Sequence, residues 1–378
     1  MIKICYVTTL SVSIKAFFIP QLKFLAENGF EVSVITSKDD TLEEMLGDNI
    51  RYIPVEIPRG VAFGASLKAI RELTKVFKRE KFDFVQYSTP NAAFYASIAA
   101  KRAKIKVRNY HLMGLRYLGE SGIKRKILYY FDRIASKKST HVECVSPSNL
   151  RLATEEKLFP KEKGCVVWNG SSGGIDLNRF DATKRETFRR EIREKYGMGE
   201  NDTVFGFVGR ITRDKGVNEI LKAFPKIENA RLMMVGAIEG IDTLNKEDYE
   251  ASLENKNVIY TGMVSEVEKY YCAMDVLLFP SYREGFGNVV MEAGAMGTTA
   301  IISDIPGPID AIKDGVSAIK IPSRNENALL EAMKRTLDSH LREELSHNAI
   351  QFIRESFDQK ILMQKILERK LNLIKELK

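Results

Sequence analysis

The stretch Val276-Leu277-Leu278-Phe279-Pro280-Ser281-Tyr282-Arg283-Glu284-Gly285-Phe286-Gly287-Asn288-Val289-Val290-Met291-Glu292 predicts a buried strand, a loop and a helix. The apolar run 276–280 is typical of a parallel strand that is covered on both faces. A helix is predicted from about Gly287, with Asn288 as its possible cap. The stretch therefore indicates an α/β fold in which this loop follows the carboxyl end of a strand.

Two glutamates flank the predicted helix start. Glu284 lies before the helix and Glu292 lies more than a turn inside it, so both can face one ligand. Gly285 and Gly287 allow the backbone to approach a ligand closely. A helix start also offers free N–H groups and the positive end of a macrodipole to an anion. The alternative, two solvated glutamates in an ordinary strand–loop–helix unit, fits the spacing equally well.

A second strand–loop–helix unit carries two cations. The buried strand predicted over 204–208 is followed by Gly209-Arg210-Ile211-Thr212-Arg213-Asp214-Lys215-Gly216 and a helical pattern. Ligands of open α/β sheets bind outside the carboxyl ends of the strands, where Arg210 and Lys215 are expected. A forked guanidinium and a compact ammonium suit a diphosphate. The alternative is a pair of exposed surface cations.

Strands and helices alternate along the whole chain of 378 residues, which predicts parallel sheets in two α/β domains. The last 38 residues are predicted to form two charged amphipathic helices. Helices in the first half are expected at 14–28, 65–79, 91–102, 123–137 and 147–157. Strands are expected at 2–8, 31–36, 51–57, 82–88, 107–111, 140–145, 164–168, 204–209, 230–236, 257–261, 276–280, 299–303 and 317–321.

The two loop segments together resemble the donor site of the retaining glycosyltransferases of family 4, which have the GT-B fold. That family carries Gly-Arg and Lys-Gly after one strand, and Glu-Gly-Phe-Gly followed by a second Glu after another. The resemblance is strongest over residues 140–325, and its Asn-Gly-Ser-Ser form is similar to the branch that builds bacterial capsule and O-antigen repeats. Further matching segments are Val142–Ser148, Val167–Asp176 with Arg179-Phe180, and Thr261–Val264.

The resemblance implies two Rossmann-like domains whose parallel sheets face each other across a cleft. Residues 1–175 would form the acceptor-binding domain, and residues 176–359 would form the nucleotide-sugar domain. The final helix, from about 360 to 378, would cross back to the N-terminal domain.

The resemblance also implies roles for single residues. Arg210 and Lys215 would neutralise the departing diphosphate, where negative charge builds up during the reaction. Glu284 would bind hydroxyls of the donor sugar, and Glu292 would bind the ribose. His111 has two interpretations, a catalytic or sugar-contacting residue and a satisfied polar residue. The other predicted donor-binding residues are Gly209, Gly236, Met263, Val264, Phe286, Gly287, Asn288 and Val289.

No metal or other cofactor is expected. The chain contains no Asp-X-Asp motif that could hold a metal on the diphosphate, and the family is usually metal-independent. Four scattered cysteines indicate a reducing cytoplasm. No apolar stretch approaches the roughly 20 residues of a membrane span. The start of the chain is predicted to be a strand of the fold and not a signal peptide.

Positive charge is concentrated in the first half of the chain. Residues 101–138 contain 12 basic and two acidic residues, interleaved with apolar ones. An anionic membrane surface or a lipid diphosphate is the favoured partner. A solvated basic face is the alternative, and nucleic acid is not expected because no recognition module accompanies the charge. The predicted membrane or acceptor patch comprises Lys101, Arg102, Lys104, Lys106, Arg108, Lys124, Arg125 and Lys126.

The sequence thus predicts a retaining glycosyltransferase. It would move a sugar, an N-acetylhexosamine by preference, from a UDP-sugar to an undecaprenyl-diphosphate-linked saccharide. The expected location is the cytoplasm, peripherally at the inner face of the plasma membrane. Two alternatives remain, a nucleotide-sugar 2-epimerase of the same architecture and a non-catalytic scaffold at the membrane. The loop after the first strand, Thr8 to Ser13, lacks the glycine pair of many family members and is expected to serve the acceptor or sugar through its hydroxyls.

Overall fold

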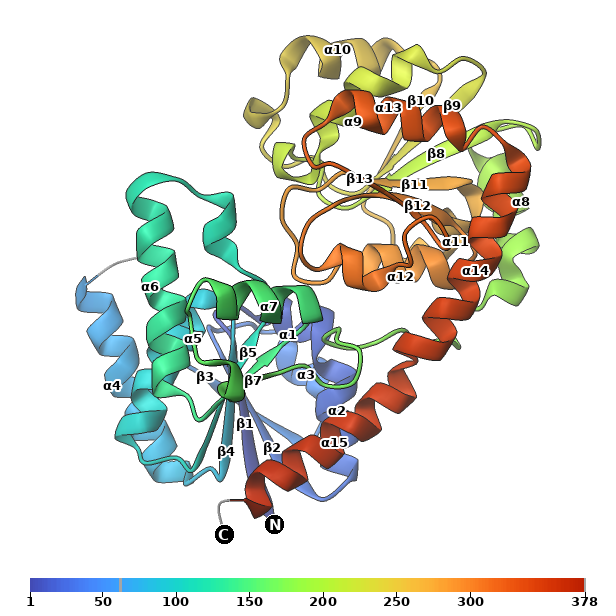
Figure 1. The fold of residues 1–378 in the computed structure, drawn as a ribbon. Coiled ribbons are helices and arrows are strands. Elements are labelled where there is room, and N and C mark those ends of the chain that lie inside the picture. The colour runs from blue at the N-terminus through green and yellow to red at the C-terminus, as the bar shows by residue number, and fades with distance from the viewer. Residues whose placement is uncertain (61–62, 377–378) are drawn as a thin grey trace. The chain divides into compact units, whose positions relative to one another are not determined.

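Two parallel β-sheets, each with helices on both faces, organise the chain (Figure 1). The computed structural model describes residues 1–60 and 63–376. The chain divides into two units, Met1–Gly174 with Lys360–Lys378 as the first and Ile175–Gln359 as the second. The predicted fold class, an α/β protein with two Rossmann-like domains, is confirmed.

The described part of the first unit contains a seven-stranded sheet of order β3-β2-β1-β4-β5-β6-β7, in which neighbouring strands pair in parallel. Its central strands are almost entirely apolar because helices cover both faces. The strands are β1 (Ile2–Val7), β2 (Phe30–Thr36), β3 (Ile50–Pro54), β4 (Phe84–Ser88), β5 (Val107–Leu112), β6 (His141–Cys144) and β7 (Gly164–Cys165).

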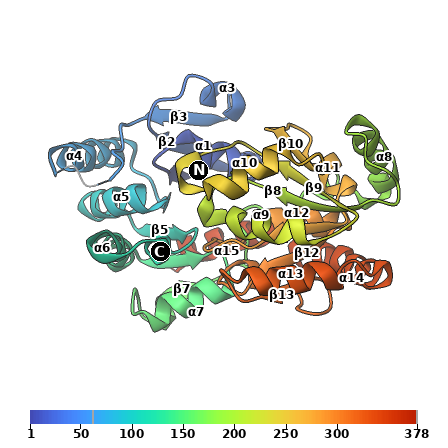
Figure 2. The same ribbon diagram turned by 90° about the horizontal axis from the view of Figure 1, so that it is seen from above.

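Two groups of helices bury these two faces. One apolar cluster receives side chains from α4, α5, α6 and α7, and the first three of these helices lie side by side in Figure 2. The other cluster receives side chains from α1, α2, α3 and α15. The helices are α1 (Ser11–Phe17), α2 (Ile19–Glu27), α3 (Leu42–Leu46), α4 (Phe63–Glu80), α5 (Pro90–Arg102), α6 (Gly122–Lys138), α7 (Pro147–Glu155) and α15 (Gln359–Lys375).

The described part of the second unit contains a six-stranded parallel sheet of order β10-β9-β8-β11-β12-β13. Its strands are β8 (Thr203–Val208), β9 (Ala230–Val235), β10 (Val258–Gly262), β11 (Val276–Phe279), β12 (Thr299–Ser303) and β13 (Ile319–Ile321). Its helices are α8 (Arg185–Lys195), α9 (Val217–Ala223), α10 (Lys246–Glu254), α11 (Val267–Ala273), α12 (Asn288–Ala295), α13 (Glu326–Arg335) and α14 (Ser339–Phe357).

Two predicted elements differ from the structure. The single helix expected at 14–28 is two helices, because Pro20 lies in the first turn of α2 and has no N–H to continue the hydrogen bonding of α1. The strand expected at 164–168 ends at Cys165, and Trp168 has a φ of 51°, which is incompatible with a strand.

The final helix returns to the first unit, as predicted. Leu373 of α15 lies in the apolar cluster of that unit, and the Lys370 ammonium donates a hydrogen bond to Gln86 of β4 at 2.8 Å. Trp168 packs against Leu362, Met363 and Ile366 of the same helix. Within the two described ranges, no helix combines the length and the apolarity that a membrane span requires.

Candidate active site

The loops after β8 and β11 meet at the carboxyl edge of the second sheet, where these strands are neighbours. The Tyr282 N–H donates to the Asp214 carbonyl at 3.0 Å. Gly216, with a φ of 76°, lies so close to Pro280 that a Cβ would be 2.2 Å from the Pro280 carbonyl oxygen. Only glycine fits such an approach. The two loops that the sequence singled out are therefore held together by their backbones.

Lys215 and Glu284 form an ion pair in this place. The Lys215 ammonium lies 2.6 Å from Oε1 of Glu284, and both side chains are mostly buried. The Ser281 hydroxyl donates to the same oxygen at 2.8 Å. Both partners are thereby fixed without a ligand, which limits the reorganisation that ligand binding requires.

Arg210 extends over the same edge and is more accessible, with 54% of its side chain exposed. Its guanidinium lies 3.2 Å from Glu239 and 3.9 Å from Asp214. Burial tends to raise the pKa of Asp214, but the Thr212 hydroxyl and the neighbouring cations outweigh it and keep that pKa low. Asp214 is thus anionic and helps to orient Arg210.

Two glycines bring the loops after β8 and β9 into contact. A Cβ on Gly236, whose φ is 137°, would lie 1.9 Å from the Gly209 carbonyl oxygen. The Gly236 N–H donates to the Gly262 carbonyl at 2.9 Å, which adds the loop after β10. In that third loop Met263 is exposed and Val264 is partly buried. The predicted nucleotide-binding loops therefore share one edge of the sheet.

The start of α12 differs from the prediction in its cap. Gly287, with a φ of 97°, is the N-cap residue, and Asn288 is the first helical residue. A glycine is favoured because the cap takes a left-handed conformation. Phe286 is buried against Phe357, with ring centroids 5.3 Å apart, so its side chain serves the core. Val289 is partly buried in the first turn.

Glu292 has partners that the sequence analysis missed. The Tyr271 hydroxyl donates to its Oε2 at 2.7 Å. Burial raises the pKa of Glu292, while the Tyr271 hydroxyl and the Arg179 guanidinium oppose this rise. Arg179, which itself contacts Glu268 at 2.8 Å, belongs to a quoted family segment and could have been suspected. Nothing in the sequence indicates that Tyr271 faces Glu292 from α11.

His111 lies in the first unit, at the end of β5. Its ring is 3% exposed, with Nε2 at 3.8 Å from Glu143 and Nδ1 at 3.4 Å from the Ser88 hydroxyl. Phe18 packs edge-on against the ring at 5.5 Å. This environment favours the alternative interpretation, a satisfied polar residue, and a catalytic role for His111 stays a prediction.

Burial lowers the pKa of His111 to about 4, and the positive charge of Lys370 adds to this while Glu143 opposes it. Between pH 6.5 and 4 the unfolded chain binds a proton that the folded chain excludes, so stability falls as the pH falls. Relative to His111→Gln, we expect the wild type to lose about 2 kcal/mol more unfolding free energy between pH 7 and 5. Urea unfolding followed by the fluorescence of Trp168 measures this, and parallel pH profiles of both proteins would contradict it.

The predicted basic patch does not form one cluster. Lys101, Arg102, Lys104, Lys106 and Arg108 lie at the end of α5 and the start of β5, at the amino edge of the first sheet. Lys124, Arg125 and Lys126 lie in the first turn of α6, about 20 Å away along that helix. Arg108 donates to the carbonyls of Lys138 and Ile105 at 2.8 and 2.6 Å, which makes it a cap for the end of α6.

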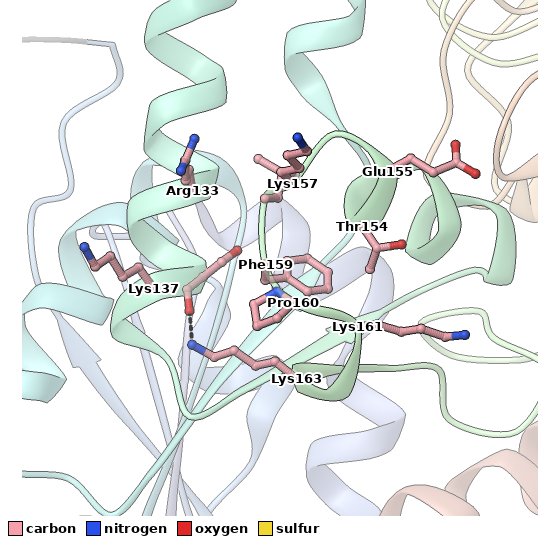
Figure 3. A pocket seen from close by; sticks show the side chains of 11 residues that line it. Arg133, Lys137, Thr154, Glu155, Lys157, Phe159, Pro160, Lys161 and Lys163 are labelled. Carbon is pink, nitrogen blue, oxygen red and sulfur yellow. Dashed lines mark hydrogen bonds between the residues drawn. The ribbon is translucent and has the colours of Figure 1, made fainter.

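Figure 3 shows a cavity of about 750 Å³ at this amino edge. It is lined by Arg133, Lys137, Lys157, Lys161 and Lys163 together with apolar side chains. The Lys163 ammonium donates to the Ser136 carbonyl, whereas Lys137 and Lys161 point away from each other. Because the charged ends do not converge, this cavity offers no common contact point for a single anion.

Comparison with known proteins adds the family. The model described as "Glycosyltransferase Family 4" matches residues 21–172, and "Glycosyl transferases group 1" matches residues 188–354. The chain is 30% identical over 370 residues to the capsular polysaccharide biosynthesis glycosyltransferase CapM of Staphylococcus aureus, covering 96% of this chain and 95% of the relative.

Another relative is the N,N'-diacetylbacillosaminyl-diphospho-undecaprenol alpha-1,3-N-acetylgalactosaminyltransferase of Campylobacter jejuni, which is 26% identical with 97% of each chain covered. Among solved structures, Anabaena Alr3699/HepE in complex with UDP superimposes with a TM-score of 0.81 at 17% identity, over 98% of this chain and 100% of the other. This likeness confirms the GT-B fold. The chain therefore belongs to glycosyltransferase family 4.

Proposed function

We propose that this glycosyltransferase moves an N-acetylhexosamine from a UDP-sugar to an undecaprenyl-diphosphate-linked saccharide, with retention of configuration, in bacterial capsule or O-antigen synthesis. The observation that carries the proposal is the fixed Lys215–Glu284 pair beside Arg210, at the carboxyl edge of the second sheet. The relatives named for capsule synthesis and for transfer to a diphospho-undecaprenol sugar support the pathway and the acceptor class.

The chemistry follows from the charges. Arg210 and Lys215 neutralise the diphosphate as its bond to the sugar breaks, and preorganised cations are the main means of lowering such a barrier. Glu284, already held by Lys215 and Ser281, accepts hydrogen bonds from sugar hydroxyls. The acceptor hydroxyl attacks from the face that the diphosphate leaves and gives its proton to a phosphate oxygen. This route requires no protein nucleophile and no metal.

We place the enzyme in the cytoplasm, peripherally at the inner face of the membrane. Residues 1–170 contain 28 basic and 17 acidic residues, and each cation close to an anionic leaflet adds about 1 kcal/mol of attraction. Sedimentation with vesicles that contain or lack anionic phospholipid measures this association. Equal binding to both vesicle types would contradict it.

A panel of UDP-, GDP- and ADP-sugars tests the proposed reaction. Release of nucleoside diphosphate is measured with and without a short polyprenyl-diphosphate saccharide. Acceptor-dependent release of UDP is expected. Conversion of the nucleotide sugar into its 2-epimer without acceptor would instead identify an epimerase, and binding without turnover of any pair would leave a scaffold.

Glu292→Ala is expected to weaken UDP binding by about 1.5–3 kcal/mol, because the carboxylate accepts hydrogen bonds from the ribose hydroxyls. Isothermal titration calorimetry with UDP measures the loss. Tyr271→Phe is the matched control, since it keeps the carboxylate and removes only the 2.7 Å hydrogen bond to it. UDP affinity unchanged in Glu292→Ala would refute the ribose role.

A further inference from the structure

The carboxyl edge of the first sheet contains a cavity of about 720 Å³ that the family motifs leave without a role. Its border is formed by the loop after β1, the segment that ends at Gly60, the start of α5 and the first half of α6. Three of its lining residues are the cations Arg59, Arg116 and Lys124, and three others are Ile123, Ile127 and Phe131. The cavity thus combines a charged and an apolar surface.

The positive charge in the cavity is largely uncompensated. Among the described residues that line it, none is acidic. Within residues 1–60 and 63–376, neither Arg59 nor Arg116 forms an ion pair. Lys124 pairs with Glu120 at 2.8 Å, but its side chain is 65% exposed, and such pairs contribute little. An anion that enters the cavity therefore finds cations available for charge-assisted hydrogen bonds.

The apolar surface is one face of α6. Ile123, Ile127 and Phe131 are spaced four residues apart and so lie on the same side of the helix. Phe131 stacks on Phe94 of α5, with ring centroids 4.1 Å apart and planes within 9°. Ile123, in contrast, is 78% exposed. An apolar ligand chain lying along this face would remove that side chain from water.

Hydroxyl groups form the remaining side of the cavity. The Thr9 and Thr89 hydroxyls are 2.8 Å apart, and the Thr9 hydroxyl also accepts the Ala92 N–H at 3.2 Å. Asn91 donates to the Gly60 carbonyl at 3.0 Å. The Thr8–Ser13 loop, which has no glycine, is thereby tied to the start of α5, and its hydroxyls face a cavity beside three cations.

We propose that this cavity binds the diphosphate and the first isoprene units of a polyprenyl-diphosphate acceptor. Arg59, Arg116 and Lys124 contact the diphosphate, whose negative charge they match, and the Ile123–Ile127–Phe131 face of α6 contacts the prenyl chain. The assignment deepens the proposed function and rests on it. It also separates Lys124 from the Lys101–Arg108 cluster, which lies at the opposite edge of the sheet.

Farnesyl diphosphate is a direct probe of the cavity. Its binding is measured by calorimetry in the presence of saturating UDP, so that the Arg210–Lys215 site of the second unit is occupied. Farnesyl diphosphate should bind more tightly than inorganic diphosphate. Arg116→Ala and Lys124→Ala should each weaken its binding roughly tenfold, as expected for one charge-assisted hydrogen bond. Ile127→Asn should weaken farnesyl diphosphate but not inorganic diphosphate.

Arg133→Ala and Lys137→Ala are the matched controls, because they remove the same charges from the other half of α6, at the cavity of Figure 3. Both should bind farnesyl diphosphate like the wild type. Lys124 is exposed, so its variant keeps the fold even if Arg116→Ala does not. An equal loss in the controls and in Lys124→Ala would overturn the proposal, and so would equal affinity of the wild type for farnesyl and inorganic diphosphate.

Transfer assays separate this proposal from the proposed function. If the wild type transfers a sugar and Lys124→Ala keeps the KM for the lipid acceptor, the cavity assignment is wrong and the function stands. If farnesyl diphosphate binds as expected and no sugar is transferred from any donor, the cavity assignment stands and the function is wrong.

Discussion

Arg210→Ala is expected to lower kcat for UDP release by about 100- to 1000-fold, the effect of removing one preorganised charge from a developing anion. The side chain is half-exposed and its partners are surface carboxylates, so the fold should be unaffected. Steady-state release of UDP in the presence of the lipid acceptor measures the effect. Thermal unfolding confirms that the variant is folded.

Two variants sharpen the test of Arg210. Arg213→Ala removes the same charge from an exposed position in the same loop and should retain activity. Arg210→Lys keeps the charge but loses the forked geometry, so it should recover only part of the rate. Equal rates for Arg210→Ala and the wild type, under conditions in which the wild type turns over, would exclude the assigned role.

Lys370→Met is expected to destabilise the first unit by about 3–5 kcal/mol, the usual loss when one partner of a buried charge pair is removed. Lys370 is 1% exposed, and its ammonium lies about 5 Å from the rings of Tyr6 and Phe84. Burial tends to raise the pKa of Glu143, but Lys370, followed by His111, outweighs this and keeps it low. Without the amine, Glu143 is buried without its main counter-charge.

Urea unfolding followed by Trp168 fluorescence measures this loss, because Trp168 is the single tryptophan and packs against α15. The double variant Lys370→Met with Glu143→Gln removes both charges and should recover most of the lost stability. If the two substitutions are additive, the buried network does not hold α15 in the way described.

Apolar runs made most of the second sheet predictable. The strands expected at 204–209 and 299–303 correspond to β8 (Thr203–Val208) and β12 (Thr299–Ser303), because a parallel strand covered on both faces needs an unbroken apolar run. The meeting of Lys215 and Glu284, 69 residues apart, also follows from topology, since both residues follow neighbouring strands.

Other features depend on geometry that the sequence does not express. Lys370 reads as a solvated residue of a charged helix, and only the rotation of α15 buries it. Lys101–Arg108 and Lys124–Lys126 are close in sequence, but α5 ends at one edge of the sheet and α6 begins at the other. The partnership of Tyr271 and Glu292 depends on how α11 packs against α12.

The configuration of the transferred sugar tests the central claim most directly. The product of wild-type turnover, with the lipid acceptor and the donor that releases UDP, is isolated and its new anomeric centre is assigned by proton NMR. The account predicts an acceptor one sugar longer whose new linkage keeps the anomeric configuration of the donor. An inverted linkage, or an altered nucleotide sugar with the acceptor unchanged, would contradict it.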